Sequence, residues 1–205
     1  MSRSRALIVL AVILAACARA PEPVPAPPAP TPTPASATAP TAAGRAMTSA
    51  DVAAFHGDAL HAVLSRPDRV TVYRIVSNRA ASDSAATIAG YPIITGPVAS
   101  SAEDATAFAA MVTGPAGYHD LRRRIETPGA PPAPGCAFRP GICAVVERGG
   151  RSAQVLICFA CSEWRLLPTD GGEPLSDHFL AIHADLRALA GRWFPNDSAF
   201  RPAAR

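Results

Sequence analysis

The sequence contains no lysine, so all 19 of its basic residues are arginines. The 16 acidic residues are spread along the chain, and the formal net charge is only +3. A protein that binds nucleic acid needs basic side chains gathered on one face or along one helix. The one basic cluster is Arg122-Arg123-Arg124, for which we expect a solvated loop face. The charge pattern therefore excludes nucleic acid as a partner.

A second absence is that of any apolar run long enough to cross a bilayer, which takes about 20 residues. The apolar run ALIVLAVIL follows two arginines and ends at Leu14, and two small alanines then lead to Cys17. A charged start, a short apolar stretch and small residues at the exit are the three parts of a secretory signal peptide. We therefore predict that residues 1–16 are a cleaved leader.

The end of this leader, Leu14-Ala15-Ala16-Cys17, resembles the lipobox of bacterial lipoproteins. The resemblance implies cleavage before Cys17, a diacylglyceryl thioether on its sulfur and an acylated N-terminus, with palmitate as a usual acyl chain. Several acyl chains hold a protein durably on a bilayer, at about 0.8 kcal/mol per buried methylene. Ala18 stands where enterobacterial sorting to the inner membrane uses aspartate, and this favours the outer membrane. The alternative is an ordinary secretory signal followed by an incidental cysteine.

Residues 17–47 begin with the predicted lipidated cysteine and continue as a stretch rich in proline and alanine. Nine prolines fall between Pro21 and Pro40, interleaved with alanine and threonine, without apolar periodicity. Nothing in such a stretch can be buried to offset the entropy of ordering it. In extended polyproline II geometry, residues 18–47 would span up to roughly 90 Å. We predict a disordered tether, with a ligand for a proline-reading module as the alternative.

The remaining residues, 48–205, are enough for one domain with its own core. Apolar spacing and Pro/Gly stops predict about three helices, and alternating β-branched runs predict strands. We expect helices over 49–65, 100–113 and 176–193, strands over 69–77, 91–98 and 164–167, and a hairpin within 136–161 that turns at Gly149-Gly150-Arg151. Helices and antiparallel strands in this order predict a single small α+β domain with a cysteine-bearing hairpin.

The four cysteines that follow the predicted lipidation site are Cys136, Cys143, Cys158 and Cys161. An exported protein meets an oxidising compartment, so an even number predicts disulfides, with three possible pairings. A two-residue turn at Gly150-Arg151 places Cys143 directly opposite Cys158, whereas a turn one residue earlier makes them diagonal. In both registers they share one face of the hairpin, and Cys136 and Cys161 share the other. We therefore expect the disulfides Cys143–Cys158 and Cys136–Cys161.

The segment Cys158-Phe-Ala-Cys161 also has the spacing of a redox CxxC motif, which lowers a thiol pKa at a helix N-terminus in thioredoxin-like enzymes. Here it ends an apolar strand and leads into no amphipathic helix. A zinc site made from the four cysteines needs convergent ligands, against which their opposite faces argue. Haem attachment needs a histidine where this chain has Ser162. Redox and metal chemistry remain the alternatives to structural disulfides.

Three short patterns together resemble a set of small, uncharacterised bacterial envelope proteins. They are Cys136-x-Phe138-x-Pro140, Val155-Leu-Ile-Cys-Phe-Ala-Cys161 and Trp193-Phe-Pro-Asn-Asp197. The resemblance covers about the last 70 residues and implies a shared domain. It brings no activity, substrate or catalytic residue, and Cys143 does not belong to the pattern.

The five histidines are His56, His61, His119, His178 and His183. Metal-binding helices favour histidines four residues apart. The pairs His56/His61 and His178/His183 are five apart, about 140° around a helix axis, so we expect core or boundary histidines. Whether His56 and His183 converge on an acid–base or metal site stays open. No GxSxG, HExxH, P-loop or dinucleotide-binding pattern occurs, and we predict no catalytic residue, metal or cofactor.

Together these features favour a membrane-anchored lipoprotein that faces the periplasm and acts by binding or support, not as an enzyme. Loss of Arg3 and Arg5 with the leader lowers the net charge from +3 to about +1. The acylated N-terminus would sit in the lipid bilayer, and the tether would let the domain reach another envelope protein or peptidoglycan. The first alternative is a thiol–disulfide redox enzyme that uses the CFAC segment, and the second is a metal-binding protein.

Overall fold

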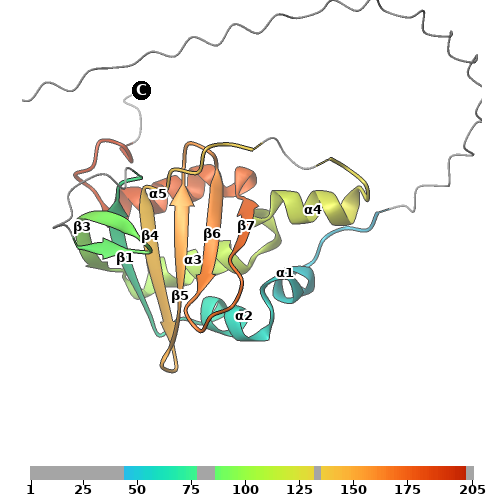
Figure 1. The fold of residues 1–205 in the computed structure, drawn as a ribbon, viewed down its shortest axis with the longest axis horizontal. Helices are drawn as coiled ribbons and strands as arrows, with labels where there is room; N and C mark the ends of the chain where they lie inside the picture. Colours follow the sequence, from blue (N-terminus) through green and yellow to red (C-terminus); the bar gives the residue numbers. More distant parts are fainter. Residues whose placement is uncertain (1–43, 78–85, 132–134, 202–205) are drawn as a thin grey trace, which may run out of the picture. The chain divides into compact units, whose positions relative to one another are not determined.

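The computed structural model describes residues 44–77, 86–131 and 135–201. The predicted leader, Cys17 and most of the predicted tether lie outside the described residues. The described part is a mixed α+β domain with a seven-stranded antiparallel sheet and five α-helices (Figure 1). The predicted α+β class is therefore confirmed, but the described residues hold more helices than the three expected.

The strands lie side by side in the order β2-β3-β1-β4-β5-β6-β7, and every neighbouring pair is antiparallel. Their bounds are Arg69–Ile75 (β1), Thr87–Ile88 (β2), Tyr91–Ala99 (β3), Ile142–Arg148 (β4), Arg151–Cys158 (β5), Glu163–Pro168 (β6) and Leu175–His178 (β7). The predicted hairpin is the pair β4–β5. Both of these strands lie inside the sheet: their side chains toward the main core are buried, and on the opposite face burial is complete only at the end that holds Cys143, Leu156 and Cys158.

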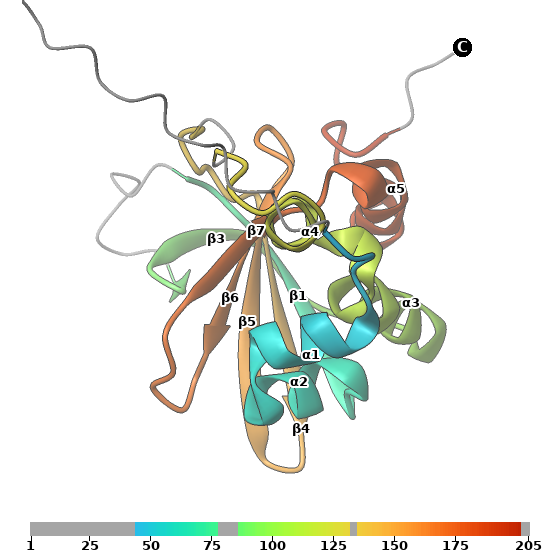
Figure 2. The ribbon, with the colours of Figure 1, turned by 90° about the vertical axis from the view of Figure 1, so that its right-hand side faces the viewer.

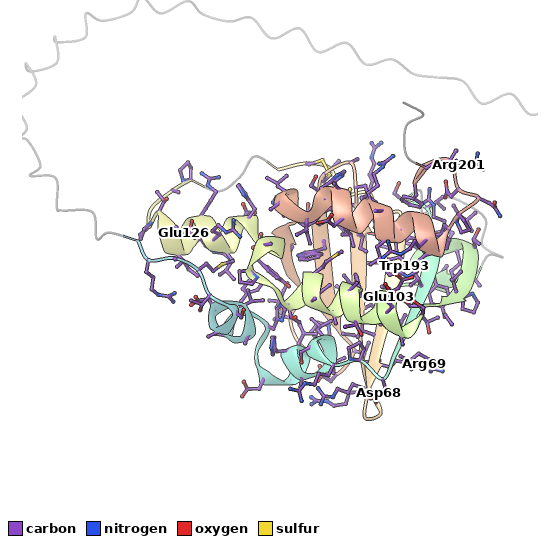
Figure 3. All side chains as sticks on the ribbon, turned by 180° about the vertical axis from the view of Figure 1, so that it is seen from behind. Asp68, Arg69, Glu103, Glu126, Trp193 and Arg201 are labelled. Carbon is purple, nitrogen blue, oxygen red and sulfur yellow. A yellow bond between two sulfur atoms is a disulfide. The ribbon has the colours of Figure 1, made fainter. Side chains whose placement is uncertain are left out.

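The helices are Ser49–His56 (α1), Asp58–Ser65 (α2), Ala102–Thr113 (α3), His119–Glu126 (α4) and His183–Trp193 (α5), with 3₁₀ turns at Pro115–Gly117 and Leu180–Ile182. Figures 2 and 3 show α2, α3 and α5 against one face of the sheet, and Figure 1 shows α4 beside β7, with α1 next to α2 at the same edge. Among the described residues, no helix combines the length and hydropathy that crossing a bilayer requires.

The main core lies between the sheet and its covering helices. Leu64, Phe108 and Trp164 are no more than 1% exposed, and they pack with buried side chains of the sheet and of the helices. Each fully buried Leu or Phe contributes about 1.5–3 kcal/mol relative to an exposed one. A second, smaller cluster on the opposite face of the sheet contains Cys143 and Leu156.

The predicted helix over 49–65 is two helices, because Gly57 interrupts it. Gly57 has φ +73°, a left-handed conformation that glycine adopts without the steric cost of a Cβ atom. Its N–H closes α1 by donating to the carbonyl of Ala53 at 3.0 Å. The chain then changes direction and starts α2 at Asp58. This break decides where the histidines on either side of it lie.

The predicted helix over 176–193 is also wrong at its start. Residues 175–178 form β7, which pairs with β6 and places His178 opposite Glu163. A 3₁₀ turn follows, and the helix begins only at His183. Pairing with an existing strand outweighs the helical spacing of the apolar residues, because it satisfies backbone groups that would otherwise be left at the edge of β6.

Helix α4 lies where a loop was expected, so the prediction of a loop face for Arg122-Arg123-Arg124 is wrong. Two of these arginines have specific contacts. Arg122 donates to the carbonyl of Pro115 at 3.0 Å, and the guanidinium of Arg124 lies 5.7 Å from the ring centre of Phe55. These contacts hold α4 against the preceding turn and against α1.

Candidate functional site

A disulfide joins Cys136 and Cys161, whose Cα atoms are 5.8 Å apart. It is one of the two pairs expected from the hairpin. Cys136 lies in the loop before β4, and Cys161 lies in the turn between β5 and β6. The bond spans a sequence separation of 25 residues, and a loop of this size gains about 2–4 kcal/mol from such a crosslink. The disulfide therefore fixes an irregular loop onto a turn at one end of the sheet.

The other expected disulfide, Cys143–Cys158, is absent, since both cysteines are free and buried. The hairpin turns at Gly149-Gly150, with φ of +54° and +77°, which is the signature of a type I′ turn. In this register Cys143 lies opposite Leu156 and only diagonal to Cys158. Diagonal neighbours are about 7–8 Å apart, too far for the Cβ atoms of a disulfide.

The two free thiols are poorly suited to nucleophilic chemistry. Burial raises the pKa of Cys143 to about 12, so its thiol is protonated at neutral pH. The sulfur of Cys158 accepts the backbone N–H of Arg139 at 3.4 Å, inside the segment that the disulfide fixes. Because Cys161 is bonded to Cys136, the CFAC segment does not form a redox pair of its own.

His56 and His61 meet, although the spacing of five predicted that they would point apart. Their Nδ1 atoms are 3.2 Å from one another. The prediction is wrong because it assumed one continuous helix, whereas Gly57 separates α1 from α2. His56 also lies 2.5 Å from the hydroxyl of Tyr118 through its Nε2, and that hydroxyl donates to the carbonyl of Val112 at 2.5 Å.

These hydrogen bonds form a series that ends at the carbonyl of Val112, and this carbonyl sets the direction of each bond in the series. Since a carbonyl only accepts, Tyr118 donates to Val112, and the tyrosine oxygen accepts the Nε2–H of His56. A neutral His56 with its proton on Nε2 accepts at Nδ1, so His61 is the donor there. Burial, aided by the charge of His61, lowers the pKa of His56 to about 4 and keeps it neutral at pH 7.

A second polar cluster lies where β7 meets the start of α4. Asp177, only 2% exposed, accepts the backbone N–H groups of Asp120, Leu121 and His178 at 2.7–2.9 Å. Two of these groups are unpaired donors of the first turn of α4, so Asp177 caps this helix from a strand 56 residues away. Burial raises the pKa of Asp177. The helix start was not predicted because its cap is remote in sequence.

His178 and Asp120 form a dyad in which Nδ1 lies 2.7 Å from a carboxylate oxygen. This is how a carboxylate orients a histidine for general-base catalysis, with Nε2 left for the substrate or nucleophile. Among the described residues, however, no hydroxyl or thiol hydrogen-bonds to Nε2 of His178. The dyad is an oriented base without a nucleophile, and its clear role is to hold β7 against α4.

His56 and His183, whose convergence the sequence left open, do not come together. His183 bonds through Nε2 to the carbonyl of Phe159 at 3.2 Å and stacks on Phe179. The rings of Tyr118, Trp164 and Phe179 follow one another in contact, and no described contact joins His56 to His183. His119, the fifth histidine, is the first residue of α4 and is half-buried.

The patterns that resemble envelope proteins meet at one end of the sheet, where they form structural contacts. Phe138 lies under the guanidinium of Arg165, at 4.0 Å from its ring centre. Asp197 accepts Nε of Arg74 at 2.6 Å, across 123 residues of sequence. We call this region, which comprises residues 135–141, 159–162 and 194–200, the disulfide end of the domain. Its residues tie the loop before β4, the β5–β6 turn and the C-terminal segment together.

Comparison with models of protein families, with curated proteins and with solved structures finds no match. The resemblance to envelope lipoproteins therefore stays a prediction. In the part of the chain that the structure describes, no three His, Cys, Asp or Glu side chains gather to hold a metal ion. Any function has to be argued from the geometry of the sites themselves.

Proposed function

We propose that the chain is a lipid-anchored envelope lipoprotein whose folded domain acts by binding a partner, not by catalysis. The proposed location in the cell envelope is supported by the leader-like residues 1–16, by Cys17 and by the proline-rich stretch that follows. The observation that carries the proposal is the Cys136–Cys161 disulfide. Stable disulfides belong to oxidising compartments, and this one serves to join loops.

The groups in the domain that could do chemistry each lack a necessary part. Cys143 is a buried thiol with a raised pKa, and Cys161 is held in the disulfide. The hydrogen-bond chain through His56 ends on a carbonyl, which cannot pass a proton onward. The His178–Asp120 dyad has no nucleophile hydrogen-bonded to it among the described residues. This arrangement favours a binding or supporting role over an enzymatic one.

The anchor is tested by replacing the cysteine that would carry the lipid. With labelled palmitate in the producing bacterium, the unaltered chain is expected to take up label and to fractionate with membranes. The Cys17→Ala variant is expected to take up no label and to keep its leader or leave the membrane fraction. Ala18→Asp is the matched variant, which keeps the label and tests sorting between the outer and inner membranes. If Cys17→Ala keeps its size and its place in membranes, the proposed anchor is wrong.

The binding role is tested by crosslinking in intact cells, followed by identification of the attached material. A tether of the predicted length has a purpose only when the domain must reach something away from the lipid. We expect either peptidoglycan fragments or one recurrent envelope protein. Recovery of neither, from cells that display the domain normally, would contradict the binding role.

A further inference from the structure

A cavity of about 430 Å³ opens at the disulfide end and is lined by residues that are remote in sequence. Three arginines belong to its lining, each from a different element: Arg74 from the end of β1, Arg139 from the loop before β4 and Arg187 from α5. The rings of Phe159 and Phe200 add apolar surface to the lining of the same cavity. The volume lies within the range of small-molecule sites, about 300–1,000 Å³.

Arg74 is held rigidly in this cavity. Its Nε donates to Asp197 at 2.6 Å, and its Nη1 donates to the carbonyls of Ile75 and Gly141 at 2.9 and 2.8 Å. The guanidinium also lies over the ring of Phe200, 5.2 Å from its centre. Its two Nη2 protons have no hydrogen-bond partner among the described residues. A fixed guanidinium with unused donors is preorganised to accept an anion.

The other two arginines add charge that the cavity does not neutralise. Arg187 donates one hydrogen bond, to the carbonyl of Ala199 at 2.6 Å, and pairs with no carboxylate of the described residues. The side chain of Arg139 is exposed and has no partner among the described residues, while its backbone N–H is bonded to Cys158. Asp197 is the only carboxylate described in contact with these three arginines, so the cavity has an excess of positive charge.

We propose that this cavity binds a small ligand that carries a carboxylate or a phosphate attached to an apolar group. The planar fork of arginine matches both oxyanions, and the two phenylalanine rings give the apolar part a surface to contact. The inference rests on the proposed binding role and names the chemistry of the ligand. The disulfide has a part in it, because it holds the loop that carries Arg139 at the mouth of the cavity.

A larger cavity, of about 810 Å³, lies between the α2–β1 connection and α3 and differs in its charges. Its Arg69 is paired with Glu147, and its Arg148 donates to the carbonyl of Ala62 at 2.7 Å. Figure 3 shows Asp68 and Arg69 at the opposite end of the domain from Arg201, which follows the disulfide end in sequence. Arg66, which lines this larger cavity and has no described partner, is therefore a suitable control for Arg139.

The test is titration calorimetry of the full chain, purified in detergent at low salt, with phenyl phosphate, benzoate and neutral benzamide as probes. We expect saturable binding of one molecule of phenyl phosphate or benzoate and none of benzamide. Inorganic phosphate should bind more weakly than phenyl phosphate, because it does not contact the phenylalanine rings. The two oxyanion probes separate a phosphate site from a carboxylate site.

Arg139→Gln should weaken binding about tenfold, since it removes one charge-assisted contact, whereas Arg66→Gln should leave affinity unchanged. Both side chains lack described partners, so both variants should fold, and circular dichroism checks this. Absence of saturable binding, or equal weakening by the two variants, would overturn the inference. If crosslinking still finds a partner, the proposed binding role survives this failure. Conversely, if the chain binds the probes but takes up no palmitate, the ligand site stands and the proposed lipid anchor is wrong.

Discussion

Two regions of this domain join segments that are remote in sequence, and they do so by different chemistry. The disulfide end uses one covalent bond, Cys136–Cys161, and one half-buried charged pair, Arg74–Asp197. The second region, which we call the polar corner, comprises residues 56–61, 112–121 and 177–178. It uses hydrogen bonds made by the buried titratable side chains of His56, Tyr118 and Asp177. The first region should therefore respond to reduction and the second to pH.

The largest expected effect is at the disulfide end. Replacing Cys136 and Cys161 together by alanine should lower the free energy of unfolding by about 2–4 kcal/mol, because the unfolded chain regains the entropy that the crosslink removes. Denaturant unfolding with and without reductant measures this. The unaltered chain should lose stability on reduction, and the double variant should not respond. If reduction leaves the stability of the unaltered chain unchanged, the disulfide does not stabilise the domain and this prediction is wrong.

The polar corner should give the domain a pH dependence in mildly acidic solution. The pKa of His56 is about 4 in the folded chain, against about 6.5 for an ordinary histidine. Between about pH 6.5 and pH 4 the unfolded chain binds a proton that the folded chain does not. The free energy of unfolding therefore falls as pH drops from about 6.5 to about 4, by about 3 kcal/mol at most.

Denaturant midpoints across this pH range check that prediction. His56→Gln should flatten the curve, and His119→Gln, at a half-buried histidine outside the chain of hydrogen bonds, should not. The raised pKa of Asp177 acts in the opposite direction, since its folded carboxyl keeps a proton to higher pH than the unfolded one. Stability that rises as pH falls from 6.5 would show that the carboxylate dominates the polar corner.

A smaller effect is expected from removing the remote cap of α4. Asp177→Ala leaves the first amides of the helix without an acceptor and should cost about 1–2 kcal/mol, the usual value of an N-cap. Hydrogen exchange should quicken at the amides of Asp120 and Leu121, which Asp177 bonds. The amides at the disulfide end should keep their protection. Equal loss of protection at both places would mean that the two regions unfold as one unit.

The smallest expected effect is the reactivity of the free thiols in the folded chain. Cys143 and Cys158 are fully buried, so a thiol reagent should label neither until denaturant is added. Labelling of the denatured, non-reduced chain should then reach both. Rapid labelling of Cys158 in the folded state would favour the redox alternative, because it would bring a reactive thiol next to Cys161.

Much of the strand pattern is readable from sequence because it depends on local alternation. The strand Arg69–Ile75, the hairpin around Gly149-Gly150 and the helix that stops before Gly114 lie close to their predicted places. The candidate sites were much less predictable. The meeting of His56 with His61 depends on a break at Gly57. A glycine inside a helical pattern is compatible both with a continuous helix and with a break, so the sequence does not decide between them.

The disulfide pairing shows how one residue of register decides a site. Turns at Gly149-Gly150 and at Gly150-Arg151 both place Cys143 and Cys158 on the same face of the hairpin. The turn in the structure is at Gly149-Gly150, and it makes the two cysteines diagonal neighbours. The parity of side chains along a strand follows from sequence position alone. The choice between two adjacent glycine turns depends on how the sheet packs, because both turns satisfy local geometry.

By itself the sequence determined which segments alternate, where proline and glycine stop them, and which residues form the leader-like start, since these properties are local. Only the tertiary structure decided that residues 175–178 pair with β6, that Asp177 caps α4 and that three arginines line one cavity. Each of these depends on contacts between segments far apart along the chain. Their energies come from surfaces and hydrogen bonds that do not exist until the domain has folded.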